Sequence, residues 1–117
     1  MLLKLATMQG LFYLLTGLWP LIDIASFQRV TGPKTDLWLV KTVGVLVTVI
    51  GVVLLMAARR HRVSRELVLL AGGSALGLAA IDLIYSLSGR ISPIYLADAA
   101  VEIGLALLWA VAWRRAE

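Results

Sequence analysis

Four long apolar runs, each of 20 residues or more, dominate this sequence of 117 residues. They cover positions 2–24, 37–58, 67–87 and 94–113, and most charged residues lie in the short islands between them. A helix needs about 20 predominantly apolar residues to cross a bilayer, and none of the runs alternates as a membrane strand would. The pattern therefore predicts an integral membrane protein with four transmembrane helices.

The connections between these runs are short, which forces neighbouring helices to be antiparallel. We therefore expect an all-α fold, an integral membrane up-down-up-down four-helix bundle that forms one transmembrane domain over residues 1–117. The first run is interpreted as a helix and not as a cleaved signal peptide, because Asp23 would occupy a cleavage position that requires a small residue. Ser64 is suited to cap the third helix, and Ser92-Pro93 to begin the fourth.

The basic residues are divided unequally between the two ends of the predicted bundle. The first and third loops carry three of the eleven, Arg29, Lys34 and Arg90. The other end carries seven, which are Lys4, Arg59, Arg60, Arg62, Arg65, Arg114 and Arg115. Lys and Arg accumulate on the cytoplasmic side of membrane proteins, so both termini are predicted to be cytoplasmic. The loop from Arg59 to Arg65 would also attract anionic lipid headgroups of the surrounding lipid bilayer.

Several classes of function have no support in the sequence. There is no cysteine and only one histidine, His61, so we expect no metal site, and we expect no cofactor. The glycine-rich phosphate loop and the G-x-S-x-G motif are both absent, which argues against nucleotide hydrolysis and α/β-hydrolase chemistry. The net charge of +4 comes from residues near the predicted membrane ends, so we expect no nucleic-acid partner.

The acidic residues have the opposite distribution, and five of the seven belong to the predicted outer half of the bundle. At a rise of about 1.5 Å per residue, Lys41, Asp82 and Asp98 each lie roughly 6–8 Å below the outer membrane boundary. Glu102 lies roughly 12 Å below it, close to the midplane. Ionisable residues are costly inside a membrane and commonly mark functional sites, so a site is predicted at this level.

Each predicted helix also carries one stripe of polar or small residues at a spacing of three or four positions. We expect these stripes to meet at the centre of the bundle. The candidate residues for binding a ligand or a proton belong to them, and they are Gln9, Tyr13, Asp23, Lys41, Asp82, Tyr85, Tyr95, Asp98 and Glu102. No catalytic residue is assigned. The glycines expected at close contacts between helices are Gly44, Gly51, Gly73 and Gly77.

A purely structural role is the alternative for each of these groups. Lys41 paired with Asp82 or Asp98 could be a fixed link between helices, and the tyrosines could be packing or interfacial residues. The acidic residues at this level outnumber the basic ones, so Glu102 has no obvious cationic partner. If it is unpaired, it would stay protonated near neutral pH because burial disfavours the charged carboxylate. Its hydrogen-bond partner could instead be Gln9, Thr48 or Ser74.

Two stretches of the chain, 30-VTGPKTDLWLVKTVG-44 and 95-YLADAAVEIGLALLW-109, carry a family resemblance. Through them the chain resembles a group of small, uncharacterised bacterial four-helix membrane proteins, whose broad layout looks like that of the DoxX-like families. The resemblance would cover most of the chain. It implies a multi-pass protein of the bacterial inner (plasma) membrane, and it implies no activity or site residue.

Three functions fit these observations. The leading prediction is a binding protein with an outward-facing polar pocket for a small polar or cationic ligand or a proton. A transport role would favour a homodimer, because one bundle of this size leaves little room for alternating access. The first alternative is a structural or interaction subunit of a membrane complex. The second is a membrane enzyme acting on a lipid-soluble substrate with Asp98 and Glu102 as an acid/base pair, which is less favoured because no nucleophile accompanies them.

Overall fold

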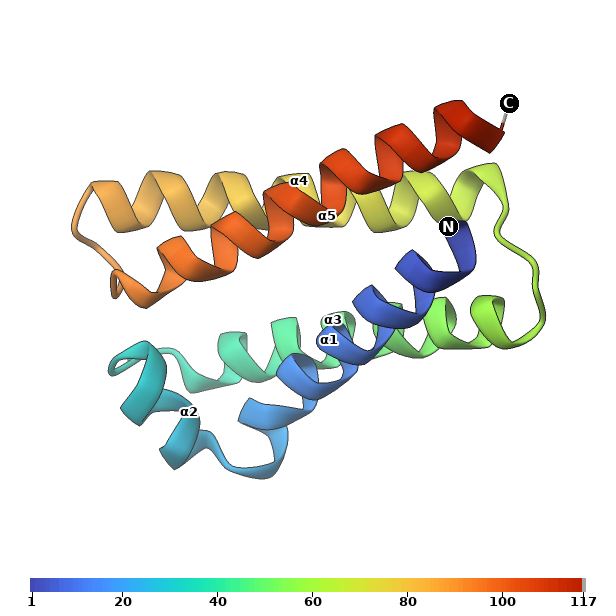
Figure 1. Cartoon of the computed structure of the whole chain (residues 1–117). Helices are drawn as coiled ribbons and strands as arrows, with labels where there is room; N and C mark the ends of the chain where they lie inside the picture. Colours follow the sequence, from blue (N-terminus) through green and yellow to red (C-terminus); the bar gives the residue numbers. More distant parts are fainter. Residues whose placement is uncertain (117) are drawn as a thin grey trace.

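The computed structural model describes residues 1–116 and contains five helices and no strand within that range (Figure 1). The helices are α1 (Leu2–Ile22), α2 (Ile24–Thr31), α3 (Leu37–Arg59), α4 (Arg65–Leu87) and α5 (Ile94–Ala116). All except α2 are long and apolar enough to cross a membrane. The predicted all-α class is confirmed, and the chain is an integral multi-pass membrane protein.

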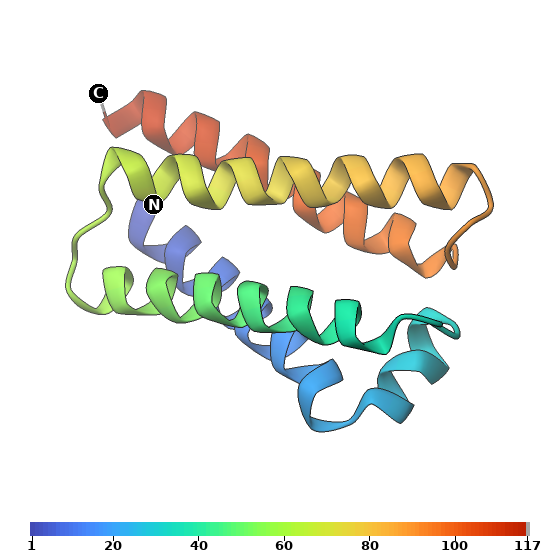
Figure 2. The same ribbon diagram turned by 180° about the vertical axis from the view of Figure 1, so that it is seen from behind.

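The two ends of the bundle are built differently. Both termini and the connection between α3 and α4 lie at one end, which we call the terminal end (Figures 1 and 2). The short helix α2 and the connection between α4 and α5 lie at the other, which we call the α2 end. Successive long helices therefore run in opposite directions, in the predicted up-down-up-down order.

The long helices form two closely packed pairs, α1 with α3 and α4 with α5. Glycines allow the first pair to approach: a Cβ atom added at Gly51 would lie 2.6 Å from the backbone nitrogen of Leu14, and one added at Gly17 would lie 2.6 Å from that of Thr48. Only residues without a side chain permit such a distance between helix backbones. Close packing at Gly44 and Gly51 was predicted from the sequence, and the structure confirms it.

The glycines of α4 do not form a close contact within the chain. A Cβ atom added at Gly73 or Gly77 would have no heavy atom within 4 Å, so the prediction for these two positions is wrong. The buried stripe of α4 is instead formed by Ala71, Ala75 and Ala79, which are spaced four residues apart. Positions two residues away from such a stripe point to the opposite side of a helix, which explains why both glycines are exposed.

The first predicted run, 2–24, is interrupted at Asp23, and the chain then forms a helix that the sequence reasoning missed. Asp23 has a non-helical backbone (φ −144°, ψ 83°), and its Oδ1 accepts a hydrogen bond of 3.2 Å from the backbone N–H of Ser26. This bond caps α2, and it holds the pKa of Asp23 below its usual range. Helix α2 ends at Gly32, whose φ of +96° is readily adopted only by glycine.

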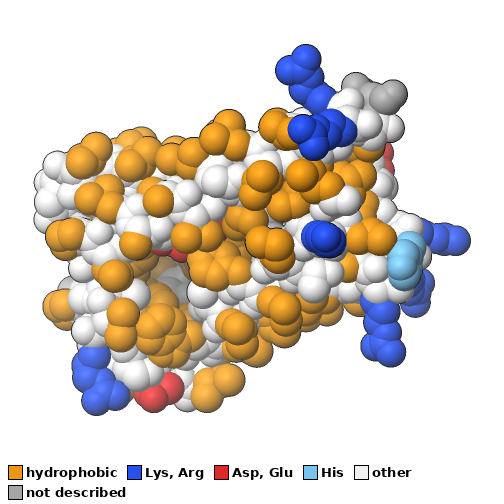
Figure 3. Space-filling model, in the orientation of Figure 1, with side chains coloured by type: hydrophobic (Ala, Val, Ile, Leu, Met, Phe, Trp, Pro, Cys, Tyr) orange, Lys and Arg blue, Asp and Glu red, His pale blue; other side chains and the backbone are white. Residues whose placement is uncertain are grey.

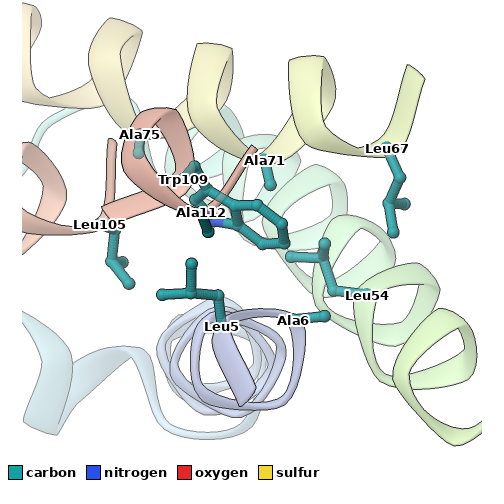
Figure 4. Close-up of a cluster of buried hydrophobic side chains, with 9 residues drawn as sticks. All are labelled: Leu5, Ala6, Leu54, Leu67, Ala71, Ala75, Leu105, Trp109 and Ala112. Carbon is teal, nitrogen blue, oxygen red and sulfur yellow. The ribbon is translucent and has the colours of Figure 1, made fainter. Parts of the chain in front are cut away.

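A cluster of buried apolar side chains fills the half of the bundle nearer the termini (Figure 4). The cluster draws on all four long helices and comprises Leu5, Ala6, Leu54, Leu67, Ala71, Ala75, Leu105, Trp109 and Ala112. Trp109 is the largest of these side chains and is fully buried at the centre of the group. The cluster joins the two helix pairs and leaves the half nearer α2 for the polar residues.

Candidate functional site

A cavity of about 500 Å³ lies between the two helix pairs in the half nearer α2. Its volume is within the range of small-molecule binding pockets. Figure 3 shows the hollow between the upper and lower layers of the molecule, with an acidic side chain visible inside it. Most of the lining side chains are apolar or aromatic. The ionisable side chains in the lining are Tyr13, Lys34, Asp82, Tyr95, Asp98 and Glu102.

Asp82 is the most informative of these side chains. It is only 6% exposed, and its Oδ2 atom is buried without a hydrogen-bond partner. Asp98 of α5 is a neighbouring acidic residue, across the contact between α4 and α5. Within residues 1–116, no lysine or arginine forms an ion pair with either group. The cavity wall therefore has an unused hydrogen-bond acceptor at this position. Such an acceptor is notable because a buried polar atom without a partner costs free energy.

Glu102 lies deeper and is fully buried. Its Oε2 accepts a hydrogen bond of 2.7 Å from the hydroxyl group of Tyr13 on α1. The sequence reasoning considered other partners for Glu102, and the structure replaces them with Tyr13 because this tyrosine is the residue of the α1 stripe at the same depth. Glu102 therefore differs from Asp82, since one of its oxygens already has a donor from the facing helix.

A second polar link lies closer to the terminal end, one helical turn away along α1 and about two turns away along α5. The Trp109 Nε1–H donates a hydrogen bond of 2.7 Å to Oε1 of Gln9, and Nε2 of Gln9 donates one of 3.0 Å to the backbone oxygen of Ala71. All of these groups are buried. The link connects α1 with both α4 and α5, and it ties Gln9 to Ala71 and Trp109 of the apolar cluster. Gln9 does not line the cavity, so it is a structural neighbour of the site.

The α2 end of the cavity is covered by α2 and the residues that follow it. The Lys34 ammonium group donates hydrogen bonds to the backbone oxygens of Thr31 and Gly32 and to the hydroxyl oxygen of Thr31, at 2.9–3.3 Å. It also lies 5.2 Å from the ring centroid of Tyr95 and 5.9 Å from that of Phe27, within the range of cation–π contacts. Lys34 thus connects the end of α2 to the start of α5.

The structure does not bring every candidate residue to the site. Lys41 is exposed on α3 and does not line the cavity, because α3 packs mainly against α1 and makes few contacts with α4. The proposed link between Lys41 and the aspartates therefore does not form. Tyr85 is 40% exposed and lies outside the cavity lining, and Asp23 is exposed and caps α2. Gln9 is buried but also lies outside the lining, whereas the other five candidates line the cavity, and they are Tyr13, Asp82, Tyr95, Asp98 and Glu102.

The sequence reasoning missed the aromatic wall and the lysine at the α2 end. Phe12, Trp19 and Phe27 line the cavity, and Trp19 packs edge-on against Phe27 with ring centroids 5.3 Å apart. The Trp19 Nε1–H also donates to the hydroxyl of Ser26 at 2.8 Å. The signal available in the sequence was the polar Asp23 between two helical stretches, which allows a helix cap and hence a turn of the chain back over the bundle.

Within the described part of the chain, no three His, Cys, Asp or Glu side chains are grouped so that they could hold a metal ion. Comparison with protein-family models, with curated proteins and with solved structures finds no match to this chain. Two neighbouring carboxyl groups without a cationic partner, enclosed by aromatic and aliphatic walls, form a site suited to a positively charged group on an apolar body.

Proposed function

We propose that this protein binds a small organic cation in the cavity between its two helix pairs. The observation that carries this proposal is Oδ2 of Asp82, which is buried in the cavity wall and has no partner. An ammonium group placed there would donate to Asp82 and to the neighbouring Asp98, forming hydrogen bonds between charged groups. Such bonds are stronger than those between neutral groups.

The aromatic lining supports the same class of ligand. The ammonium group of Lys34 already lies against Tyr95 and Phe27 at the α2 end, so an alkylammonium is compatible with this wall. Phe12 and Trp19 provide further ring surface in the same cavity lining. Aromatic rings attract cations through their negative faces, and this attraction increases when water is excluded.

The test is a binding titration of the protein in lipid nanodiscs with hexylamine, and with hexanol as the neutral analogue. We expect Asp82-dependent binding of the amine and none of the alcohol. Asp82→Asn should weaken amine binding by about 10- to 150-fold, since a hydrogen bond to a charged group contributes roughly 1.5–3 kcal/mol. The matched control is Asp36→Asn, which removes an exposed carboxyl outside the cavity lining. Equal binding by Asp82→Asn and the unaltered protein would contradict the proposal.

We also infer that the protein resides in a bacterial inner membrane with both termini in the cytoplasm. The support is the resemblance carried by residues 30–44 and 95–109 and the excess of basic residues at the terminal end, where the loop at 59–65 would lie among anionic lipid headgroups. The chain has no cysteine, so single cysteines can report sidedness. A membrane-impermeant maleimide should label Arg90→Cys in intact spheroplasts and Arg62→Cys only after permeabilisation. The reverse pattern would invert the topology.

A structural or interaction subunit is the second candidate function. It is favoured by the buried bonds between Tyr13 and Glu102 and between Gln9 and Trp109, which fix the helix pairs to each other. In that case the unaltered protein should bind no amine. The variant Asp82→Leu should fold with undiminished stability, because an apolar residue would replace an unpaired polar one. The enzyme alternative, with Asp98 and Glu102 as the acid/base pair, stays a prediction.

A further inference from the structure

The direction in which the cavity opens restricts the ligand further. In Figure 3 the molecule is seen from the side, across the axes of the long helices, and the hollow is visible from this direction. The long helices cross the membrane, so this side of the bundle faces lipid. The opening therefore leads to the bilayer.

Residues at the edge of the cavity support this geometry. Val30, Val43 and Val101 all line the cavity, and they are 51%, 51% and 47% exposed. Each therefore has one side toward the cavity and another on the outer surface of the bundle. Val101 lies seven residues after the start of α5, which corresponds to roughly 10 Å along the helix and hence to the hydrocarbon region.

The route along the bundle axis is obstructed. Toward the α2 end, the C-terminal end of α2 approaches the start of α5, as both ribbon views show (Figures 1 and 2). Lys34 occupies this position with three hydrogen bonds and two aromatic contacts, so its donors are fully used. Toward the terminal end, the link between Gln9 and Trp109 and the apolar cluster close the path.

From these observations, and resting on the proposed function, we propose that the ligand is a single-chain amphiphilic amine that enters from the bilayer. Its ammonium group binds at Asp82 and Asp98, and its alkyl chain passes over the edge near Val101 into the surrounding lipid. A carboxyl pair below the membrane surface with an apolar opening toward lipid suits a molecule with one charged end. A compact water-soluble amine would leave the opening unfilled.

The experiment compares dodecylamine with hexylamine in nanodiscs at equal free concentration. Equilibrium dialysis against empty nanodiscs fixes that concentration, and binding to Asp82→Asn is subtracted so that only pocket binding remains. We expect dodecylamine to bind at least tenfold more tightly than hexylamine. The variant Val101→Trp should reduce this ratio at least fivefold by filling the path of the alkyl chain. Leu107→Trp, which places the same side chain on an exposed position of α5 outside the cavity, should leave the ratio unchanged.

The outcomes separate the two proposals. If hexylamine binds in an Asp82-dependent manner and dodecylamine binds no more tightly, the cavity takes a compact cation and the amphiphile proposal is overturned. An unchanged ratio in Val101→Trp would also overturn it, because the chain would not pass this edge. If neither amine shows Asp82-dependent binding, the proposed function itself is wrong. The ratio of two affinities in one folded sample is not affected by a partial loss of folded protein.

Discussion

Replacing Gly51 by alanine is expected to destabilise the protein, whereas the same change at Gly77 is not. The Cβ atom introduced by Gly51→Ala would meet only backbone atoms, lying 2.6 Å from the nitrogen of Leu14 and 2.8 Å from the oxygen of Gly10. An ordinary contact begins at 3.4 Å, so α1 and α3 would have to separate by about 0.8 Å. Backbone atoms of two paired helices cannot rotate away as a side chain can.

The expected change in the free energy of unfolding is a loss at Gly51, and either no change or a gain at Gly77. Overpacking of a tight interior contact costs about 1–3 kcal/mol, which is the loss expected for Gly51→Ala. A Cβ atom at Gly77 has no heavy atom within 4 Å, so no contact is strained. Alanine is also the better helix former by about 1 kcal/mol, so Gly77→Ala should leave the stability unchanged or raise it by up to that amount.

The measurement is the free energy of unfolding in mixed micelles, titrated with a denaturing detergent and followed by tryptophan fluorescence, because Trp109 is buried in the folded protein. Both variants change one glycine to alanine within a membrane helix, so they have the same composition and differ only in the position of the change. A loss at Gly77 as large as that at Gly51 would refute the packing argument, since it would require a neighbour that packs on the exposed face of α4. Unchanged stability of Gly51→Ala would refute the close contact between α1 and α3.

Two further predictions concern the polar links. The change Gln9→Leu leaves the buried Trp109 N–H without an acceptor, so a loss of about 1–3 kcal/mol is expected, and adding Trp109→Phe should recover part of it. A double-mutant cycle should give a coupling of about 0.6–1.7 kcal/mol, and strictly additive losses would contradict the link. The Asp23 cap should be strongest at neutral pH and weaken as the pH falls through its lowered pKa, because the carboxylate is a stronger acceptor for the Ser26 N–H than the protonated carboxyl group is. An acid-induced shift of the Ser26 amide resonance in NMR spectra, absent in Asp23→Ala, is the expected signal, and an equal shift in the variant would argue against it.

The residues that face the interior were largely predictable from spacing. Tyr13, Asp82 and Glu102 belong to stripes that repeat every three or four positions, and all three are buried in the structure. The stripe on α5 was correct through Trp109, which is fully buried. Spacing predicts these residues because a helix turns by a fixed angle per residue. Residues that share a face can therefore be identified without knowing which helix packs against that face.

The partner of each face was not predictable, and Lys41 shows why. Its depth matches that of Asp82 and Asp98, but it is exposed because α3 packs mainly on α1. Depth along a helix is fixed by the sequence, whereas rotation about the helix axis and the choice of neighbour depend on packing. The glycines of α3 and α4 illustrate the same point, since both sets have a spacing suited to close packing and only those of α3 are used.

The sequence by itself determined that four helices cross a membrane, since each apolar run is long enough to span a bilayer and water would not solvate it. It also determined which polar residues share a helix face. Only the tertiary structure decided that α1 pairs with α3, that α2 covers one end of the cavity, and that Asp82 is left without a hydrogen-bond partner. The physical reason is that lipid solvates apolar side chains as well as another helix does. Helix pairing therefore depends on the fit of small residues and on a few buried hydrogen bonds, which exist only once the helices have packed.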